Sequence, residues 1–502
     1  MNAPSFKIPD CIGSFIDGKQ HVGAGPRLPI MNPATDQAIS ELAQAQADEV
    51  ALAVNSARRA FEHGPWPRMS VEQRQVILRS IHQVLLTNAQ ELAYLECLNT
   101  GIVMREIEQR HLRRAALNFS FFADYIGQSS DAVYRQTQGY TTTVVREPVG
   151  VAALIAPWNA PLALSSMQIA SAIAFGTTCV VKPSEQSPLA VARMVELLCE
   201  AGLPAGVVNL VNGLGPVTGQ ALVTHPGIDR VSFTGGTETG RHIMAAAAQN
   251  LVPCTLELGG KSANIIFASA DLDRALDGAL LGIFSNNGQQ CLAGSRILVE
   301  RRILDDFMTR FVARTQALRL GDPLDENTEL GPLASRMQMN RVLQFAQQAP
   351  GEGCTVLAGG ERASGFAAGY YVQPTAVLAP NNQCSAARQE IFGPFATLLT
   401  FDHEDEALAI ANDSEFGLVS YVWSDHLPTV THMTEGLRTG VVWVNTPMMR
   451  ELRAPFGGFK NSGVGRQSGQ ACEAFFTEEK AITVPTRVHP LRKLGVFSGP
   501  HF

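Results

Sequence analysis

Cys291 is the residue whose surroundings best suit covalent chemistry. It ends the polar, glycine-containing segment 286–291 (NNGQQC), which we expect to form a turn between a helix and a strand. A thiol is a strong nucleophile, and a helix terminus or a bound cation can lower its pKa. The alternative is an inert buried cysteine, which is our interpretation of most of the other eight cysteines.

Glu257 and Asn159 also carry side chains that could take part in a reaction. Glu257 ends a predicted strand before two glycines, where a carboxylate with a raised pKa could act as a general base. A capping or ion-pairing carboxylate is the alternative. Asn159 follows Pro157 and Trp158 at another strand end, where its amide could stabilise an oxyanion. Neither residue decides the function alone.

A glycine-rich turn, residues 235–240 (GGTETG), follows a third predicted strand. Turns of this kind present backbone N–H groups to a phosphate at the start of a helix. The segment is neither the GxGxxG dinucleotide fingerprint nor a nucleoside-triphosphate loop. By itself it does not identify a ligand.

These residues lie at the ends of strands in a repeating strand–helix pattern. Five predicted strands are separated by four predicted helices, which is typical of an open parallel sheet with crossover helices. The predicted strands are 151–155, 178–182, 207–211, 230–234 and 254–258. Ligands of such sheets bind beyond the carboxyl ends of the strands. We therefore expect one site from the segments 157–159 (PWN), 182–185 (KPSE), 233–236 (FTGG) and 257–261 (ELGGK).

Two or three surface helices are predicted in the first hundred residues, after a short extended lead-in. An apolar stripe at helical spacing runs from Val50 to Phe61. Ser70 and Gln73 form a capping-box pattern that opens a second helix. A third helix ends at Gly101, which is expected at the position after its last helical turn. We interpret these helices as packing scaffold.

A second alternating series, from about residue 263 to residue 444, predicts another α/β domain. Its expected strands are 264–267, 296–299, 396–401, 419–422 and 441–444. The β-rich runs 140–147 and 481–484 lie outside both series. We interpret these two runs as a small edge-strand element that is shared with another subunit.

The composition excludes several classes of protein. The chain has 502 residues, of which 45% are hydrophobic and 17% are charged, as in ordinary globular proteins. Because 39 Lys and Arg face 46 Asp and Glu, the net charge is −7, and nothing indicates the basic face of a nucleic-acid binder. No apolar run is long enough to span a bilayer, and the N-terminus from Met1 lacks a signal-peptide pattern.

The nine cysteines contain no CxxC pair and no Cys/His cluster with the spacing of metal ligands. This usage argues against a disulfide framework and against a metal site, and it favours a reducing compartment. We therefore expect a cytoplasmic protein with no metal, no membrane partner and no nucleic-acid partner.

Seven motifs, in order and at matching spacing, resemble the aldehyde dehydrogenase superfamily over essentially the whole chain. Single motifs of four residues arise by chance, but seven in register do not. They are PWN at 157–159, KPSE at 182–185, FTGGTETG at 233–240, ELGGK at 257–261, GQQC at 288–291, EIFGP at 390–394 and PFGGFKNSGVGR at 455–466.

The resemblance implies an α/β fold with a Rossmann-like coenzyme domain and an α/β catalytic domain. The coenzyme domain would comprise residues 1–125 and 149–259, and the catalytic domain residues 260–450. A small β oligomerisation element would comprise 126–148 and 474–495, and would extend the sheet of a neighbouring subunit. We therefore expect a homodimer or a homotetramer.

The resemblance also implies NAD-dependent oxidation of an aldehyde to a carboxylic acid. Cys291 would attack the aldehyde carbon, and the Asn159 amide and the Cys291 backbone N–H would hold the oxyanion. Glu257 would activate the water that hydrolyses the resulting thioester. Relatives that pass the acyl group to coenzyme A typically lack a carboxylate at this position, so the chain resembles the hydrolytic type.

The coenzyme-binding residues are carried over in the same way. Lys182 and Glu185 match residues at the adenosine ribose, where a carboxylate favours NAD over NADP. Thr234 lies near the nicotinamide, and Glu390 and Phe392 match residues at the nicotinamide ribose. The remaining expected coenzyme contacts are Trp158, Gly235, Gly236 and Leu258.

The segment 450–456 (RELRAPF) resembles the RELRxPFGG pattern of hydroxymuconate-semialdehyde-type dehydrogenases. Arginines bind carboxylates through two parallel hydrogen bonds, so the expected substrate is a carboxylate-bearing semialdehyde from aromatic ring cleavage. We expect Arg453, then Arg114, with Arg110 and Phe456, to line the substrate site. The alternative is that these arginines pair with neighbouring glutamates at the surface.

Three other functions compete with this interpretation. The same chemistry could act on a neutral aromatic or aliphatic aldehyde. The fold could serve as a non-catalytic structural protein, although both the cysteine and the glutamate are present. The thiol could also act as an esterase, which a dependence of turnover on NAD would distinguish.

Overall fold

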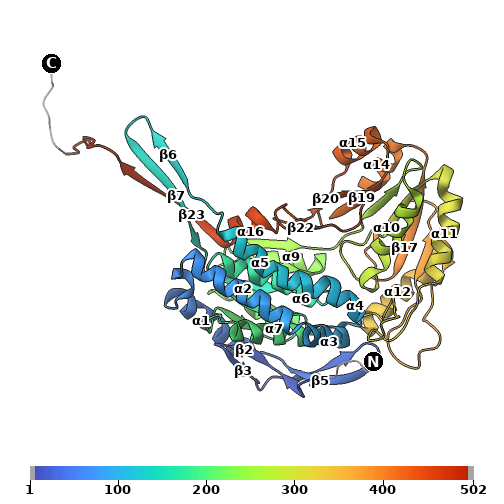
Figure 1. Cartoon of the computed structure of the whole chain (residues 1–502), viewed down its shortest axis with the longest axis horizontal. Helices are drawn as coiled ribbons and strands as arrows, with labels where there is room; N and C mark the ends of the chain where they lie inside the picture. The colour runs from blue at the N-terminus through green and yellow to red at the C-terminus, as the bar shows by residue number, and fades with distance from the viewer. Residues whose placement is uncertain (1–5, 496–502) are drawn as a thin grey trace.

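The computed structural model describes residues 6–495, and it contains two large sheets and a projecting arm (Figure 1). Residues 1–5, which belong to the N-terminal segment considered for a signal peptide, lie outside the described residues. Within residues 6–495, no helix is both long and apolar enough to cross a membrane. The α/β fold class is confirmed.

The first large sheet has eight strands in the order β22-β12-β11-β8-β9-β10-β2-β3. Its parallel centre consists of the five predicted strands, which are β8 (Val151–Ile155), β9 (Thr178–Lys182), β10 (Val208–Leu210), β11 (Arg230–Thr234) and β12 (Cys254–Glu257). Short antiparallel strands that were not predicted complete its edges, namely β2 (Ser14–Ile16), β3 (Lys19–His21) and β22 (Gly463–Val464).

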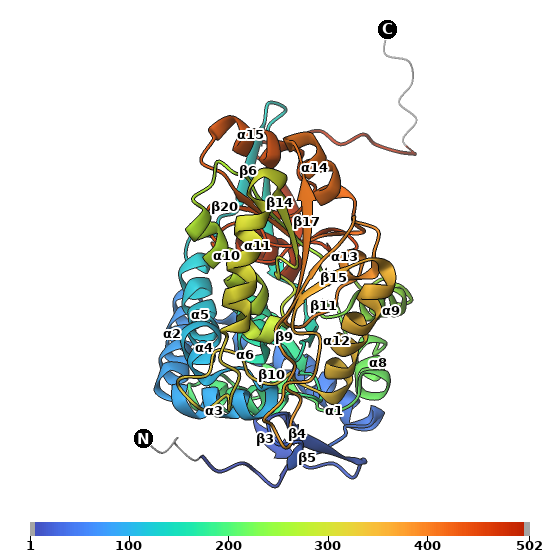
Figure 2. The same ribbon diagram turned by 90° about the vertical axis from the view of Figure 1, so that its right-hand side faces the viewer.

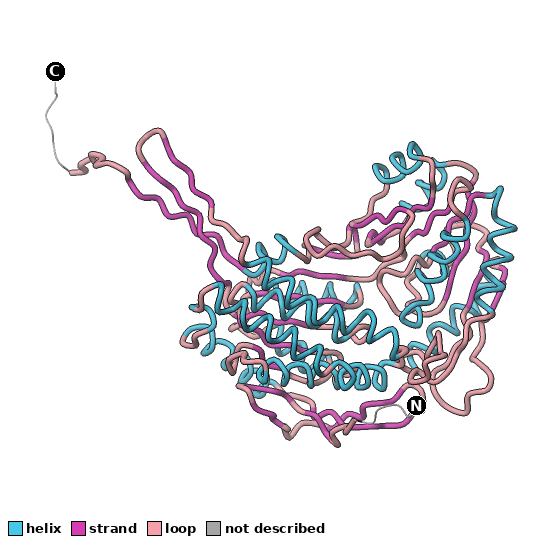
Figure 3. Tube along the Cα trace, in the orientation of Figure 1, coloured by secondary structure: helices cyan, strands magenta, loops and turns pink. Residues whose placement is uncertain are grey.

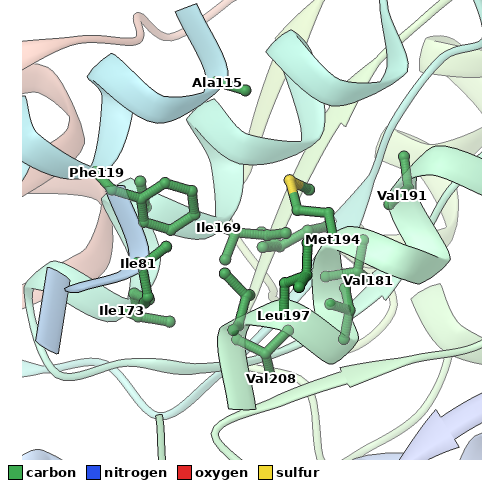
Figure 4. Packing of buried hydrophobic residues seen from close by; sticks show 14 of the residues in the cluster. Ile81, Ala115, Phe119, Ile169, Ile173, Val181, Val191, Met194, Leu197 and Val208 are labelled. Carbon is green, nitrogen blue, oxygen red and sulfur yellow. The ribbon is translucent and has the colours of Figure 1, made fainter. Parts of the chain in front are cut away.

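The helices between these strands cover both faces of the sheet. They are α6 (Pro161–Ala174), α7 (Leu189–Glu200), α8 (Gln220–Val223) and α9 (Thr237–Ala248). In Figure 4, Ile169 of α6 and Leu197 of α7 pack over Val181 and Val208 of the sheet. The helix α6 is buried on nearly all sides, because further helices form a second layer over it. Phe119 belongs to this second layer and packs in the same core (Figure 4).

That second layer comes from the N-terminal quarter of the chain. It contains α2 (Val71–Thr87), α3 (Ala89–Thr100), α4 (Met104–Glu106), a π-helical turn (Ile107–Leu112) and α5 (Arg113–Ile126), while α1 (Ala47–Glu62) contacts β9 on the other face. The Ser70–Gln73 capping box is present, and Gly101 ends α3 with a φ of 74°. The expectation that all these helices lie at the surface is wrong for α3, because its last turns are buried and include Glu96 and Asn99.

The expected lead-in is extended, but it is not short, because residues 6–45 contain five strands. In addition to β2 and β3, these are β1 (Cys11–Ile12), β4 (Arg27–Asn32) and β5 (Gln37–Ala43), which form a separate sheet in the order β1-β5-β4. The strands β1, β2 and β3 have only two or three residues, too few to show the alternating pattern on which strand prediction depends.

The second large sheet has seven strands in the order β15-β16-β17-β14-β13-β19-β20, of which Figure 2 labels β15, β17, β14 and β20. The five predicted strands are present as β13 (Ala263–Ile266), β14 (Arg296–Glu300), β17 (Phe395–Phe401), β19 (Val419–Trp423) and β20 (Val441–Val444). The edge strand β15 (Thr355–Ala358) and its neighbour β16 (Thr375–Leu378) were not predicted. The helices of this part are α10 (Leu272–Phe284), α11 (Leu304–Gln316), α12 (Arg336–Gln348), α13 (Ser385–Arg388), α14 (Glu404–Asn412) and α15 (Leu427–Gly436).

The arm is a three-stranded antiparallel sheet that projects away from both large sheets (Figure 3). Its strands are β6 (Ala132–Gln136), β7 (Tyr140–Pro148) and β23 (Thr477–Pro485), with β7 in the centre. The two β-rich runs outside the alternating series therefore pair with each other, in a register from Thr477–Pro148 to Pro485–Tyr140. A short helix, α16 (Gly469–Phe476), leads into β23. The strands β18 (Phe416–Gly417) and β21 (Phe459–Lys460) form a separate two-stranded antiparallel sheet.

Candidate active site

The segment before Cys291 is a strained turn held by side chains from distant elements. Asn286, Asn287 and Gly288 all have left-handed backbone conformations, with φ of 58°, 55° and 72°. Such conformations cost free energy in residues other than glycine, and they persist only where the surroundings impose them. The Asn287 amide donates to the carbonyls of Gly101 (2.8 Å) and Pro332 (2.9 Å), so two distant segments of the chain hold the turn in place.

Asn159 reaches the same turn from the loop that follows β8. Its side-chain amide donates a hydrogen bond of 2.8 Å to the carbonyl of Gln289. In return, the Asn286 amide donates to the carbonyls of Asn159 (2.8 Å) and Gln289 (3.0 Å). One of the two N–H groups of the Asn159 amide is thus engaged, and the other is left for a further acceptor.

Cys291 lies partly buried against an aromatic cluster. Tyr421, Trp443 and Phe456 form this cluster together with Leu418. Burial raises the pKa of the thiol to about 12, and the nearby carboxylates Glu390 and Glu257 add to the effect. The thiol is therefore protonated at neutral pH unless a charge or a base in the site changes its environment.

Glu257 is buried at the end of β12, and neither carboxylate oxygen has a hydrogen-bond partner among residues 6–495. Gly457 makes room for it, because a Cβ there would lie 3.0 Å from Oε1. Burial raises the pKa of Glu257 to about 8, and the positive charges of Arg450 and Arg466 oppose this rise. A carboxyl group with such a pKa can accept and release a proton near neutral pH.

Arg450 is a charged neighbour that the sequence interpretation did not select. Its guanidinium lies 3.8 Å from the centre of the Phe456 ring, and Nη2 donates to Ser468 Oγ at 3.0 Å. Its Nε is shielded from solvent and has no partner among the described residues. Burial lowers the pKa of Arg450, while the charges of Glu257 and Cys291 raise it, so these groups interact.

A cleft of about 800 Å³ opens at the carboxyl ends of β8, β9 and β11. Of the expected coenzyme residues, it is lined by Trp158, Lys182, Glu185, Thr234, Gly235 and Gly236. A Cβ at Gly236 would meet no atom within 4 Å, so the start of α9 is open to the cleft and its backbone N–H groups are available to an anion. The residues fit a dinucleotide, and use of NAD is confirmed.

Lys182 and Glu185 lie together at the base of this cleft. Lys182 Nζ is 3.7 Å from Glu185 Oε2 and donates to the carbonyl of Pro183 at 3.1 Å. Burial lowers the pKa of Lys182, and Glu185 partly opposes this. A carboxylate held in this position can accept hydrogen bonds from ribose hydroxyls and repels a phosphate.

The other three expected coenzyme residues lie beside the cleft and do not line it. Leu258 is buried and packs against Gly240 in α9. The Phe392 ring meets the Trp158 ring edge-on, with centroids 5.3 Å apart. Glu390 accepts a hydrogen bond from Gly260 N–H at 2.9 Å. Burial raises the pKa of Glu390 to about 7.

The structure separates the expected substrate residues. Phe456 packs in the aromatic cluster, and Arg114 Nε donates to Asn118 Oδ1 at 2.8 Å. Burial lowers the pKa of Arg114 to about 9, and the charge of Arg450 contributes. Arg110 pairs with Glu106, and Arg453 pairs with Glu451 through two hydrogen bonds of 2.9 Å.

Pairing with neighbouring glutamates, which was the alternative for these arginines, thus describes Arg110 and Arg453. The Arg453 side chain is 78% exposed. Arg450, three residues earlier, is the arginine of this segment whose charge acts on Glu257 and Cys291. The binding of substrate by Arg453 and Arg110 stays a prediction.

Sequence reasoning also missed part of the coenzyme cleft. His242 on α9 lines it, as do Gly215 and Gly219 in the π-helical turn after β10. The glycine spacing in residues 213–219 (GLGPVTG) was a visible signal, because it follows a predicted strand at the same edge of the sheet. No local signal marked His242, which faces the cleft only because of the direction of α9.

Comparisons with known proteins agree with this geometry. A family model described as the aldehyde dehydrogenase family matches residues 21–482. The chain is 39% identical over 483 residues to the 2-hydroxymuconic semialdehyde dehydrogenase of Pseudomonas sp. (strain CF600), covering 94% of this chain and 99% of the relative. It is 40% identical over 463 residues to the 5-carboxymethyl-2-hydroxymuconate semialdehyde dehydrogenase of Escherichia coli, covering 91% and 97%.

A solved structure is similar over almost the whole length. The NAD+ complex of an aldehyde dehydrogenase from Bacillus cereus superposes with a TM-score of 0.93 at 38% identity, covering 95% of this chain and 97% of that one.

Proposed function

The chain belongs to the aldehyde dehydrogenase family, and we propose that it oxidises a carboxylate-bearing semialdehyde to the acid through a covalent bond to Cys291. The observation that carries the proposal is that the Asn159 amide bonds to the turn before Cys291, while Glu257, a buried carboxylate without a hydrogen-bond partner in the range 6–495, lies close enough to affect the pKa of the thiol. An amide donor, a base and a nucleophile are the parts that acyl chemistry requires.

The first half of the reaction forms a bond between Cys291 Sγ and the aldehyde carbon. The thiol proton passes to solvent, and negative charge develops on the aldehyde oxygen. The free N–H of the Asn159 amide and the Cys291 backbone N–H stabilise that charge. NAD bound in the cleft would supply the acceptor for the hydride of the same carbon, and Cys291 would then carry the acyl group as a thioester.

The second half hydrolyses the thioester. Glu257 accepts a proton from a water molecule, whose oxygen attacks the thioester carbon. The carbon–sulfur bond breaks, the acid leaves, and the thiol is regenerated. The pKa of Glu257, about 8, lets the same carboxylate release the proton to solvent before the next turnover.

The coenzyme contacts follow from the cleft. We assign the adenosine ribose to Lys182 and Glu185, the pyrophosphate to the backbone at Gly235 and Gly236, and the nicotinamide end to Thr234. Trp158, Leu258, Glu390 and Phe392 would complete the nicotinamide side of the site.

The substrate class rests on the arginines near the thiol. Arg110 contacts Met448, which packs against the aromatic cluster around Cys291, and Arg450 lies close enough to Arg114 for its charge to lower the pKa of Arg114. A cationic surface beside an apolar wall fits a substrate with a carboxylate on a short unsaturated chain. The names of the two relatives, which both specify muconate-type semialdehydes, support the same class.

A comparison of substrates tests this class. We expect Arg453→Ala and Arg110→Ala each to raise KM for a muconate-type semialdehyde about tenfold, with little change for benzaldehyde, because only the former presents a carboxylate. Arg301→Ala is the matched control, since Arg301 is also exposed and paired, with Asp402. Equal losses on both aldehydes would remove the arginines from substrate recognition, and a preference of the wild type for benzaldehyde would establish the neutral substrate instead.

We also propose the domain division of residues 1–125 with 149–259, residues 260–450, and the arm segments 126–148 with 474–495. The arm carries exposed apolar side chains at Val133, Tyr134, Ile482 and Val484, which association with a second copy would cover. We expect a cytoplasmic homodimer or homotetramer. Light scattering of the wild type and of a chain with these four residues changed to serine tests the assembly.

A further inference from the structure

Glu106 connects two parts of the site that the sequence places far apart. It ends α4, immediately before the π-helical turn, and its side chain is 17% exposed. Oε2 accepts a hydrogen bond of 2.9 Å from the backbone N–H of Asn286. Oε1 pairs with the guanidinium of Arg110, four residues along the same helical segment. One carboxylate therefore contacts both a predicted substrate-binding arginine and the turn that carries the nucleophile.

The turn that carries the nucleophile begins at Asn286, the residue whose backbone N–H bonds to Glu106. Asn286 has the first of the three left-handed conformations, and its side-chain amide is already used by the carbonyls of Asn159 and Gln289. A left-handed asparagine persists only when its surroundings hold it. The carboxylate of Glu106 is the acceptor that holds the backbone of this residue, through a hydrogen bond strengthened by charge.

The other oxygen of Glu106 pairs with Arg110, whose guanidinium also contacts Met448. Arg110 Nη2 lies 3.8 Å from Met448 Sδ, and Met448 packs with the aromatic cluster against Cys291. The π-helical turn adds one residue to the helix between Glu106 and the rest of α5, and such turns are frequent at functional sites.

We propose that Glu106 is a positioning residue that holds the nucleophile turn through Asn286 and orients Arg110 toward the substrate. This inference deepens the proposed function and rests on it. Glu106 does not touch the reacting atoms. It acts because the position of Cys291 relative to the Asn159 amide depends on the conformation of residues 286–288, and small displacements of reacting groups lower rates strongly.

Two substitutions separate the two contacts. Glu106→Gln keeps an oxygen that can accept from Asn286 N–H but loses the charge that pairs with Arg110. Glu106→Ala loses both. Glu108→Ala is the matched control, because Glu108 lies in the adjoining π-helical turn and its side chain makes no hydrogen bond or ion pair with any residue in the range 6–495.

The measurement is the pre-steady-state burst of NADH, which reports the formation of the thioester. With a neutral aldehyde, we expect Glu106→Ala to slow the burst about tenfold or more while KM and NAD binding change less than about threefold, since the hydrogen bond positions the turn and not the ligands. Glu106→Gln should recover most of the burst rate. With a muconate-type semialdehyde, Glu106→Gln should still raise KM about fivefold, because Arg110 is no longer held.

Three results are informative. A burst in Glu106→Ala equal to that of Glu108→Ala would overturn the positioning role. Equal damage in Glu106→Ala and Glu106→Gln, with a lowered unfolding midpoint in both, would also overturn it in favour of a purely structural role. A wild type that forms no NADH with any aldehyde would instead overturn the proposed function, which keeps the two failures distinct.

Discussion

The side-chain amide of Asn159 donates a hydrogen bond of 2.8 Å to the carbonyl of Gln289, two residues before Cys291. The loop after β8 and the nucleophile turn are thereby joined, although 130 positions separate the two residues in the sequence. The bond fixes the orientation of the amide, so its second N–H points in a defined direction. Preorganised donors of this kind stabilise an oxyanion without rearrangement during the reaction.

Replacement of Asn159 by alanine removes both the oxyanion donor and this link. We expect kcat to fall by about 100-fold to 1,000-fold, as for other oxyanion donors, while the dissociation constant of NAD stays within about threefold. Steady-state kinetics and fluorescence titration with NAD measure the two quantities. Asn118→Ala is not a suitable control, because Asn118 supports Arg114. Asn327→Ala, in an exposed loop, is a better one. Parallel losses of NAD binding and kcat would show that Asn159 maintains the conformation of the whole loop after β8 and does not act as an oxyanion donor alone.

The pKa of Glu257 predicts how the rate depends on pH. Burial raises this pKa to about 8, so the proton is on the carboxyl group below that value and is lost above it. A general base works only when ionised, and at pH 7 only about a tenth of a group with this pKa is ionised. The rate of thioester hydrolysis should therefore rise with pH through about 8 and then level off. Single-turnover hydrolysis between pH 6 and pH 10 measures it, and a rate independent of pH in this range would exclude Glu257 as the base.

Arg450 should control the position of that pH profile. Its positive charge lowers the pKa of Glu257, and it is held over Phe456 and bonded to Ser468. Arg450→Leu removes the charge, so the profile should move to higher pH by about one unit. Arg450→Lys keeps the charge and should leave the profile close to that of the wild type. If the pH profile of Arg450→Leu matches that of the wild type, Arg466 and not Arg450 is the arginine that lowers the pKa of Glu257.

Glu185 should determine the choice between NAD and NADP. Its carboxylate lies 3.7 Å from Lys182 Nζ at the base of the cleft. With the carboxylate gone in Glu185→Ser, Lys182 becomes free to bind a 2′-phosphate, so kcat/KM for NADP should rise by about tenfold or more relative to NAD. Coenzyme kinetics at a saturating aldehyde concentration provide the ratio. An unchanged ratio would place the adenosine ribose elsewhere in the cleft.

The parts of the fold that the sequence predicted are those with strong local patterns. The strands β8 and β9 are fully buried runs of mostly apolar residues, and the structure has them at the predicted residues. The strands β2 and β22 have three and two residues, and they join the sheet by pairing with β10 and β12, which lie far away in the sequence. The capping box at Ser70 is visible because both of its partners are local.

The same distinction holds at the candidate site. The chemical groups of Cys291, Glu257 and Asn159 were visible at strand ends and in motifs, although their roles remain to be tested. Glu106 was not visible, because its contact with Asn286 spans 180 residues and depends on a π-helical turn. Arg450 and Arg453 are only three residues apart, and the sequence could not show which one faces inward.

The most direct test of the central claim is to trap the covalent intermediate on Cys291. Glu257→Gln should still form the thioester but not hydrolyse it, because the amide cannot take a proton from water. With NAD and a muconate-type semialdehyde, we expect one NADH per active site and a mass increase of one acyl group on the peptide that contains Cys291. Cys291→Ala should give neither. NADH formation without a mass increase on that peptide, or an adduct on another cysteine, would contradict the account.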